Sequence, residues 1–596
     1  MNGKWIVLRM LALALLLSLF PFVSFADSAV PPMTIRYDGN GGVSEAFGAV
    51  IDRRISGTHL RENTLLGTSY FHREGFVLTG WNTMPDGSET HTGLGSRVTF
   101  SEGLILYAEW AEASDESLFT FRDGTVISYA GKEQDITVPE TIGGVPVRAI
   151  AAGAFSDRPI RSLVLPPSME RIEEGAFSGC PIETLTLFDR ITDVSDASFA
   201  GCSISTVRMN AARMPVYSGS YFDGFSDRYD YLLSLGDSRK LILFSGSSGR
   251  YGYDSPALEE AFPEYRVVNM GVYAYTNALP QYEMIRPFLK EGDLLLAAPE
   301  FDAVPEQFCV SSRLDTGFWA MMESNYDAAS SLDMTGFSGI FDSFAEYQRV
   351  RSGMGSRSYG ESPSSYDDDG NRYDFATYNR QGDFILPRPN SEKDELHRHN
   401  IADYTAETVT PEAIDALDRE LKRFTGSGIG VYFTYAPRNR SSLTERSTKE
   451  AREQVHRLLT ERLSVPVISD LEDSLYSGVY FWNIDNHLST EGVQIRTMQV
   501  IRDLKKALYG ESSEALSAPS LKVPYPAALG LYLLALLLPL LGLWKRFSWA
   551  GYAAGFVWAA ATIAALLSGA PVSVALICTL PLLLVSACER KRGEEQ

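Results

Sequence analysis

Three side chains from two distant parts of this chain are of the types that carry out acyl transfer. Ser248 follows an apolar run, and Asp485 and His487 stand two residues apart much later in the sequence. A serine hydroxyl is a poor nucleophile until a histidine accepts its proton, and a carboxylate commonly holds that imidazole in the right tautomer. The sequence therefore predicts Ser248 as the nucleophile, His487 as the general base and Asp485 as the residue that orients the histidine.

The serine needs a sharp turn that exposes its hydroxyl. Residues 240–262 predict this arrangement, because an apolar strand stops at Gly246 and a helical pattern follows. Glycine at 246 and 249 suits a strained turn in which residues with φ > 0 are needed. The earlier run Gly-Asp-Ser at 236–238 precedes its strand and is rejected as the nucleophile site for that reason.

A second apolar segment, residues 265–273, predicts a neighbouring strand. Asn269 and Gly271 stand where this strand should end. Backbone N–H groups and amide side chains at strand ends can stabilise the oxyanion that forms when a serine attacks an ester. The backbone N–H groups of Ser248 and Gly271, together with Asn269, are the predicted oxyanion donors.

The histidine must precede a helix rather than lie inside one. Side chains two residues apart share a side in an extended segment and not on a helix. A helix is therefore predicted to begin after His487, with Ser489 as its cap. Apolar residues recur at helical spacing beyond that point, namely Val493, Met498, Ile501, Leu504 and Leu508.

In this order the three blocks resemble the SGNH (GDSL-like) hydrolase superfamily over residues 230–508. The resemblance implies an α/β flavodoxin-like three-layer domain at 225–510, with an insertion at about 311–400, and serine esterase or O-acyltransferase activity without a metal or cofactor. Its Asp-x-His spacing is similar to that of bacterial surface O-acetylation proteins and DHHW-type proteins. The superfamily's third-block asparagine is absent from DLLLAAPEFD at 293–302. The Pro-Glu-Phe of this run and a later TYAP look like the membrane-tethered D-alanyl-lipoteichoic acid transfer proteins.

Two repeat modules precede this domain. Residues 33–110 contain short alternating strands separated by Asn-Gly and Asp-Gly turns, with Trp81 predicted to be buried. The motifs IRYDGNGG, REGFVLTGWNTMPDGS and LILYAEW in this module resemble the Listeria-Bacteroides (internalin B-type) repeat. At 117–212, Phe155, Phe177 and Phe199 recur every 22 residues, which indicates a solenoid of about three repeats. This module resembles the BspA-type leucine-rich repeats, and so short an array is expected to lean on its neighbours.

The two ends of the chain predict export and anchoring. Residues 1–26 combine basic residues, an apolar run and a small-residue cleavage site, as in a signal peptide. After a linker at 511–525, residues 526–588 contain three apolar stretches, each close to the ~20 residues that span a bilayer. The basic residues between them and in the tail at 589–596 fit a cytoplasmic side. We expect a multi-pass C-terminal anchor in the cell membrane and a large extracytoplasmic N-terminal region.

The predicted fold class is therefore multidomain: a small β repeat domain, a short leucine-rich solenoid, an α/β flavodoxin-like domain and C-terminal transmembrane helices. A formal charge of −22 disfavours nucleic acid as a partner, because phosphate would be repelled. The predicted function is a membrane-anchored surface esterase or O-acyltransferase that acts on acylated cell-envelope glycans. The implied partners are a cell-wall or surface polysaccharide, the lipid bilayer and an acyl-exporting membrane protein. The alternative is a surface adhesion or scaffold protein with a non-catalytic hydrolase-like domain.

Overall fold

The computed structural model describes residues 33–55, 65–96, 103–212, 223–271, 277–301, 310–323, 325–353, 378–392 and 401–510. The chain divides into two compact units, Met1–Leu504 and Lys505–Gln596. The predicted signal peptide, linker, membrane spans and cytoplasmic tail all lie outside the described residues. Within the described residues, no helix has the length and apolar character needed to cross a bilayer.

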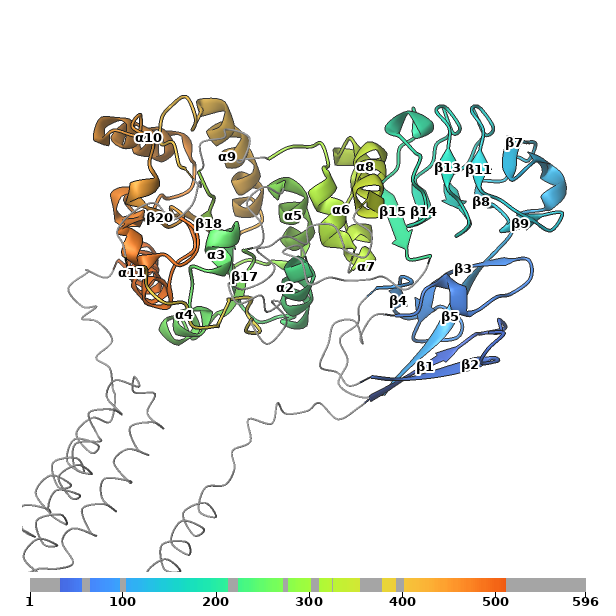
Figure 1. Cartoon of the computed structure of the whole chain (residues 1–596), viewed down its shortest axis with the longest axis horizontal. Coiled ribbons are helices and arrows are strands. Elements are labelled where there is room, and N and C mark those ends of the chain that lie inside the picture. The colour runs from blue at the N-terminus through green and yellow to red at the C-terminus, as the bar shows by residue number, and fades with distance from the viewer. Residues whose placement is uncertain are drawn as a thin grey trace, which may run out of the picture. The chain divides into compact units, whose positions relative to one another are not determined.

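A five-stranded sheet in the order β2-β1-β5-β3-β4 forms the first module (Figure 1). Trp81 is fully buried, as predicted, and its indole N–H donates to the Leu66 carbonyl at 2.9 Å. The Asn-Gly turn is also confirmed, because Asn40 and Gly41 both have positive φ. The strands are β1 (Met33–Asp38), β2 (Val50–Ile55), β3 (Phe76–Asn82), β4 (His91–Thr92) and β5 (Leu104–Glu112).

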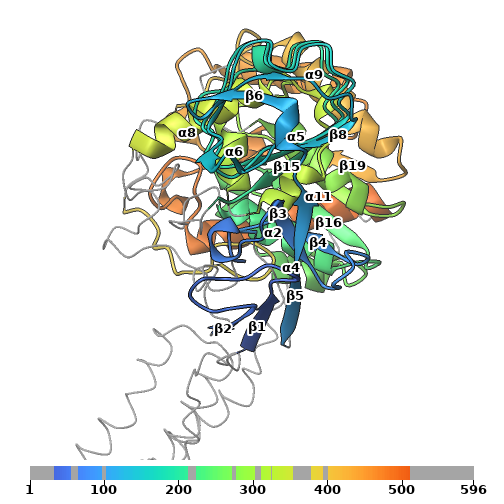
Figure 2. The same cartoon turned by 90° about the vertical axis from the view of Figure 1, so that its right-hand side faces the viewer.

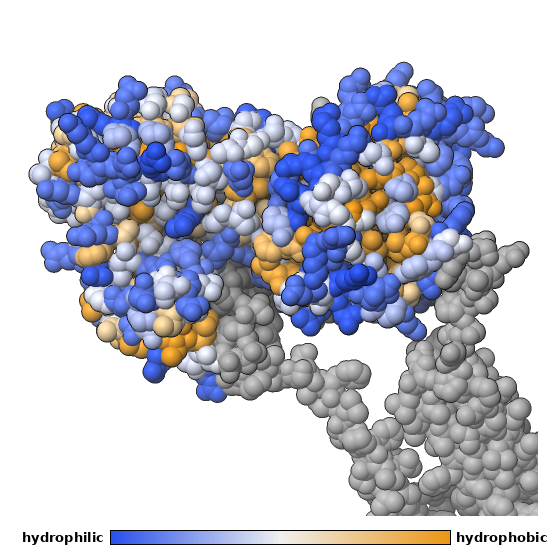
Figure 3. Space-filling model, turned by 180° about the vertical axis from the view of Figure 1, so that it is seen from behind, coloured by the Kyte–Doolittle hydropathy of each residue, from blue (hydrophilic) through white to orange (hydrophobic). Residues whose placement is uncertain are grey.

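This module also exposes large apolar side chains. Phe47 is 61% exposed and Val43 is 55% exposed, and Val50, Met84 and Ile105 are exposed as well. Orange surface is visible on this module at the lower left of the space-filling view (Figure 3). The other modules expose large apolar side chains too, for example Val145 and Ile385, and single exposed apolar side chains are normal on protein surfaces.

The second module is a solenoid whose strands form two sheets, β13-β11-β7-β6 and β15-β14-β12-β8. The pairing is parallel except between β6 and β7, which are antiparallel. The turns of the solenoid overlap when it is viewed along its axis (Figure 2). Leu163 pairs with Leu185, and Leu185 with Val207, so the 22-residue period is the register of the ladder. Cys180 and Cys202 are both free thiols. The strands are β6 (Phe119–Arg122), β7 (Thr125–Tyr129), β8 (Asp135–Thr137), β9 (Thr141–Ile142), β10 (Val145–Pro146), β11 (Ala149–Ile150), β12 (Ser162–Val164), β13 (Arg171–Ile172), β14 (Thr184–Phe188) and β15 (Thr206–Asn210).

A ladder of stacked phenylalanine rings runs through the solenoid and continues beyond it. The rings of Phe155 and Phe177 lie 4.8 Å apart, and those of Phe177 and Phe199 lie 5.2 Å apart. The last ring, Phe199, stacks at 4.4 Å on Phe341, which belongs to α8 (Ile340–Gly353). The expectation that the short array leans on its neighbours is therefore confirmed at this end.

The same helix is also joined to the solenoid by hydrogen bonds. The Asp196 carboxylate accepts from the backbone N–H groups of Gly339 at 2.6 Å and Phe341 at 2.8 Å, which satisfies donors at the start of α8. The described part of the predicted insertion at about 311–400 contains the helices α6 (Thr316–Met322), α7 (Tyr326–Ser330) and α8. Of these, α8 packs against the last phenylalanine ring of the solenoid.

The third module contains a four-stranded parallel sheet in the order β17-β16-β18-β19, which is the order 2-1-3-4 of doubly wound flavodoxin-like sheets. A parallel bridge from Phe433 to Val467 extends it. Every residue of β16 and β18 is buried, as expected for a sheet covered on both faces. The strands are β16 (Lys240–Ser245), β17 (Arg266–Asn269), β18 (Leu294–Ala298), β19 (Gly430–Phe433), β20 (Arg438–Asn439) and β21 (Leu475–Tyr476).

Helices complete this mixed α/β module, and most of them contribute buried residues to the same hydrophobic core as the solenoid. They are α2 (Asp223–Ser234), α3 (Ser247–Arg250), α4 (Ser255–Ala261), α5 (Ala278–Ile285), α6 (Thr316–Met322), α7 (Tyr326–Ser330), α8, α9 (Pro411–Thr425), α10 (Lys449–Arg462) and α11 (Thr490–Tyr509).

Candidate functional site

The serine turn has the predicted strand, turn and helix. β16 ends at Ser245, Gly246 makes the turn and α3 begins at Ser247. The predicted reason for the two glycines is wrong, however: Gly246 has a φ of −79°, and neither glycine is among the described residues with positive φ. Gly249 is required by close packing instead, because a Cβ there would lie 2.8 Å from the Cβ of Ser245.

The structure corrects the predicted serine. Ser247, not Ser248, faces the histidine, with 2.9 Å between its Oγ and the Nε2 of His487. The Oγ of Ser248 lies 3.0 Å from the Oγ of Ser245, which in turn donates to the Ala298 carbonyl. Ser248 is fully buried, whereas Ser247 is 7% exposed. The first serine of the pair is therefore the one that contacts the imidazole.

His487 lies in the loop that precedes α11. The helix begins at Thr490, and the Ser489 hydroxyl accepts from the Gly492 N–H at 3.1 Å, so the predicted start and cap are confirmed. The Nδ1 of His487 lies 3.0 Å from the Oδ1 of Asn483, while its Nε2 faces Ser247. A neutral imidazole that takes a proton from serine at Nε2 carries its own proton at Nδ1, and the Asn483 oxygen can accept that proton in a hydrogen bond.

Asp485 does not occupy the position predicted for it. Its Oδ1 accepts from the Asn439 side-chain amide at 2.6 Å, and its backbone carbonyl accepts from the Asn439 N–H at 2.9 Å. The prediction assumed an extended segment, but the His487 N–H donates to the Ile484 carbonyl at 3.3 Å, which closes a turn. Because a turn breaks the alternation of side chains, Asn483 rather than Asp485 meets the imidazole.

The electrostatic surroundings of His487 keep its imidazole neutral. The side chain is 2% exposed, and burial lowers its pKa well below the usual value of 6.5. The positive charges of Arg388, Arg250 and Arg438 lower this pKa further. A neutral imidazole at neutral pH is the form that can accept a proton from a serine hydroxyl.

The three predicted oxyanion donors are already engaged. The Ser248 N–H donates to the Oε1 of Glu300 at 2.7 Å. The Gly271 N–H donates to the Oδ1 of Asn269 at 3.0 Å, and the Asn269 amide donates to the Gly249 carbonyl at 2.9 Å. An oxyanion could use the Ser248 donor only after the Glu300 carboxylate moves away.

The sequence predicted no role for Glu300, although this residue lies in the Pro-Glu-Phe motif. Besides the Ser248 N–H, its carboxylate accepts from the Asn486 side chain at 2.6 Å through Oε2. The side chain therefore joins the serine turn to the loop that carries His487. The signal was present in the sequence, because a glutamate directly after an apolar strand stands where an active-site edge is expected.

Asp383 was also missed, because it comes from the predicted insertion. Its carboxylate accepts from the Asn269 amide at 2.7 Å, the Ser255 hydroxyl at 2.7 Å and the Asn379 amide at 2.8 Å. Burial raises its pKa, and these donors oppose that rise. Residues 378–392 are thus built into the site, and Asp383 holds Asn269 at the end of β17.

Aromatic rings form a wall beside the imidazole. The Tyr251 and His487 rings lie 4.1 Å apart, and Tyr251 packs in turn on Phe384 and Trp482 at 5.0 Å and 6.1 Å. Phe384 and Trp482 stack on each other at 5.9 Å. The wall limits water around the base, which is consistent with the burial of His487.

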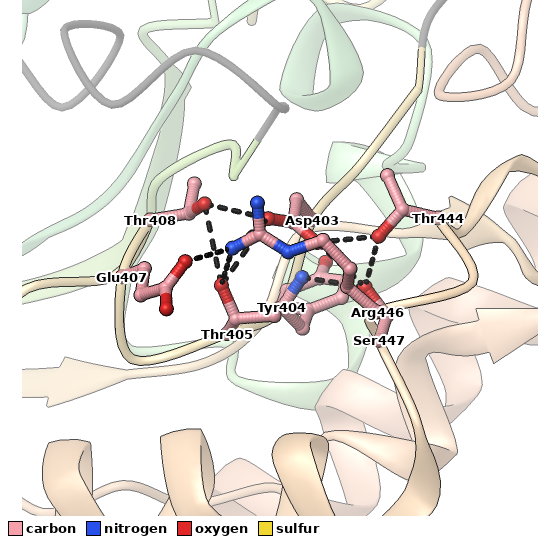
Figure 4. A network of polar contacts seen from close by, with 8 residues as sticks. All are labelled: Asp403, Tyr404, Thr405, Glu407, Thr408, Thr444, Arg446 and Ser447. Atoms are coloured by element: carbon pink, nitrogen blue, oxygen red, sulfur yellow. Dashed lines mark hydrogen bonds and ion pairs between the residues drawn. The ribbon is translucent and has the colours of Figure 1, made fainter.

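A polar network surrounds Asp403 (Figure 4). Asp403 accepts from the hydroxyls of Thr408 at 2.7 Å and Thr405 at 3.2 Å, and also from that of Thr444. Burial raises the pKa of Asp403, but these hydroxyls outweigh burial and hold the pKa below its usual value. The ring of the neighbouring Tyr404 lies 5.7 Å from that of Phe301, the residue after Glu300.

Within the described part of the chain, no group of three or more histidine, cysteine, aspartate or glutamate side chains is arranged to hold a metal ion.

Comparison with known proteins bears on the solenoid. No curated protein matches the chain. The sequence model of the BspA type leucine rich repeat region matches residues 148–227 in six copies, more than the three indicated by the 22-residue spacing. This match covers the later strands of the solenoid and the first residues of α2. The chain therefore contains a BspA-type leucine-rich repeat region joined to a mixed α/β module.

Proposed function

We propose that this protein is a surface serine esterase or O-acyltransferase of the SGNH-like type, anchored in the cell membrane and acting on acylated cell-envelope glycans. The observation that carries the proposal is the 2.9 Å contact between the Ser247 hydroxyl and the Nε2 of His487. The strand order of the parallel sheet and the position of the serine after its first strand support the resemblance to that superfamily.

In the proposed reaction, His487 takes the hydroxyl proton of Ser247 while Oγ attacks the acyl carbonyl. The tetrahedral intermediate collapses, the alcohol leaves with the proton held at Nε2, and the acyl group remains on Ser247. His487 then takes a proton from water or from a glycan hydroxyl, which attacks the acyl-enzyme and releases the serine. Asn483 keeps the ring oriented throughout, and the aromatic wall excludes bulk water.

The setting of this reaction is inferred from the ends of the sequence. Residues 1–26 and 526–588 have the composition of a signal peptide and of membrane spans. Such a chain would hold the catalytic module against the outer face of the membrane, close to wall polysaccharide. An acyl-exporting membrane protein is the donor partner that the resembled families imply.

Labelling with a fluorophosphonate tests the catalytic assignment on the full-length chain. We expect the wild-type chain and the Ser248→Ala variant to be labelled, and Ser247→Ala to lose labelling. His487→Ala should be labelled far more slowly, because its serine lacks a base. Loss of labelling in Ser248→Ala but not in Ser247→Ala would overturn the assignment of Ser247, and equal, negligible labelling of all chains would overturn the esterase proposal.

The pH dependence of the reaction follows from the lowered pKa of His487. The imidazole must be neutral to act as a base, and its pKa lies well below 6.5 in the folded chain. We therefore expect kcat/KM for ester hydrolysis to stay constant as the pH is lowered from 8 through 6.5, and to fall only at more acidic pH. A half-maximal point near the ordinary histidine pKa of about 6.5 would contradict this expectation.

A second function, surface adhesion or scaffolding, is favoured by a different observation. Residues 148–227 match BspA type leucine rich repeats, and the β module exposes large apolar side chains such as Phe47. Under this proposal the α/β module is a platform and Ser247 has no reaction to perform. The labelling experiment separates the two functions, because a platform would show no dependence of labelling on His487.

A further inference from the structure

One described segment of the predicted insertion, residues 378–392, contacts both halves of the candidate site, and we call it the strap. On the serine side, the Phe384 N–H donates at 3.1 Å to the carbonyl of Arg250, the last residue of α3. On the histidine side, the backbone of Arg388 exchanges two hydrogen bonds with Thr490, the first residue of α11. The Arg388 N–H donates to the Thr490 hydroxyl at 2.8 Å, and the Thr490 N–H donates to the Arg388 carbonyl at 3.0 Å. The strap therefore joins the two elements that carry the reacting side chains.

The guanidinium group of Arg388 makes this connection more direct. The side chain is 5% exposed, and its Nε donates at 2.9 Å to the carbonyl of Leu488, the residue after His487. Its Nη1 donates at 2.9 Å to the carbonyl of Phe384, whose own N–H is bonded to the end of α3. A chain of three hydrogen bonds thus runs from the loop that carries His487, through the guanidinium group, to the helix that begins at Ser247.

The aromatic wall holds the same guanidinium group from another side. The central carbon of the Arg388 guanidinium lies 5.0 Å from the centre of the Phe384 ring and 5.6 Å from that of the Tyr251 ring. A cation over the face of an aromatic ring is attracted to it. Tyr251 is also the ring that lies 4.1 Å from the imidazole of His487. The direction of the planar guanidinium fork is therefore fixed by two carbonyls and by the wall beside the base.

We infer that Arg388 is a positioning residue, which holds the loop of His487 against the helix of Ser247 at the separation that proton transfer requires. This inference rests on the function proposed above and deepens it. The 2.9 Å between the Ser247 hydroxyl and the Nε2 of His487 is within reach for proton transfer, and a displacement of about 1 Å can lower the rate about 10²-fold. Arg388 acts through the backbone of Leu488, so it has no need to contact the substrate.

Steady-state hydrolysis of 4-nitrophenyl acetate by the full-length chain tests the inference with the variant Arg388→Lys. Lysine keeps the positive charge, but its ammonium group cannot direct two donors along the fork of a guanidinium group. We expect kcat to fall about 10²-fold. The KM should change little, because Arg388 acts on the geometry of the pair and not on the binding of the ester. An unchanged kcat would overturn the inference.

Arg496→Lys is the matched control. Arg496 on α11 is fully buried, and it donates to the Thr434 hydroxyl at 3.3 Å and to the Tyr435 carbonyl. These partners belong to the segment after β19 rather than to the serine turn or the histidine loop. We expect Arg496→Lys to lower the free energy of unfolding and to leave kcat unchanged. The kcat is expressed per folded chain, with the folded fraction taken from the amide protection of β16 and β18. An equal loss of kcat in both variants would indicate a general effect of buried arginines and would overturn the inference.

A second variant decides if Arg388→Lys does not fold. Thr490→Val keeps the branched shape of the side chain at an exposed position and removes the acceptor of the Arg388 N–H. We expect it to lower kcat about two- to tenfold, the range that one hydrogen bond contributes. An unchanged kcat in Thr490→Val would overturn the inference.

Two outcomes separate this inference from the proposed function. Hydrolysis that depends on Ser247 but is unaffected by Arg388→Lys and Thr490→Val would overturn the inference and leave the esterase proposal standing. Hydrolysis that Ser247→Ala does not reduce would overturn both.

Discussion

Replacing His487 with alanine is expected to lower kcat for ester hydrolysis by about 10⁴-fold, the upper end of what one positioned acid–base group contributes. The reason is geometric: the Nε2 of His487 lies 2.9 Å from the Ser247 hydroxyl, and the buried ring is kept neutral. Without the imidazole, the serine has no acceptor for its proton. The measurement is the steady-state rate with a chromogenic acetate ester, and a loss of less than tenfold would contradict the assignment.

The side chains around His487 predict which substitutions should lower the rate of ester hydrolysis most. Asn483, which contacts the Nδ1 of His487, should matter more than Asp485, which accepts from Asn439. A positioning role is tested by Asn483→Asp, because a carboxylate beside the imidazole would raise its pKa and move the acidic limb of the pH–rate profile to higher pH. A merely structural role would change the stability of the chain and leave that limb in place.

Removal of the Phe341 ring is expected to destabilise the first unit of the chain by about 3–5 kcal/mol, the usual cost of a buried phenylalanine changed to alanine. Phe341 is 3% exposed, and its ring stacks at 4.4 Å on Phe199, the last ring of the ladder. The change leaves a cavity at the junction between the solenoid and α8. Because both modules share one hydrophobic core, the effect should reach the α/β module too.

Urea unfolding of the full-length chain measures the loss in free energy of unfolding. Hydrogen exchange, measured residue by residue, shows whether the solenoid strands and the α/β strands lose protection together. Phe47→Ala is the matched control, since Phe47 is 61% exposed and its loss should change the free energy of unfolding by less than about 0.5 kcal/mol. Solenoid strands that open independently, with unchanged protection in β16 and β18, would contradict a shared core.

Several features of this protein could be predicted from sequence because they depend on local patterns. The 22-residue recurrence of Phe155, Phe177 and Phe199 is the register of a parallel ladder, and a repeat must place equivalent residues in equivalent positions. The strand at 240–245, the turn after it and the helix after Ser489 follow from apolar spacing and from a capping hydroxyl. Each of these signals lies within a few residues of the element that it predicts.

Only the tertiary structure decided which side chains meet. Ser247 and Ser248 are adjacent in sequence, and the direction in which each hydroxyl points depends on how α3 starts, so the pairing with His487 could not be read from the spacing. The turn that removes Asp485 from the imidazole is also closed by a contact within the folded loop.

Contacts between segments that are distant in the sequence cannot be predicted from any local pattern. Asp383 contacts Asn269, which lies 114 positions away, and Asn486 contacts Glu300, which lies 186 positions away. Phe341, which stacks on the last ring of the solenoid, comes from the segment predicted as an insertion into the α/β domain. The sequence alone determined the repeat, the strands and the types of side chain near the chemistry. Packing decided their partners, because a buried polar group must find a hydrogen-bond partner wherever the fold brings one close.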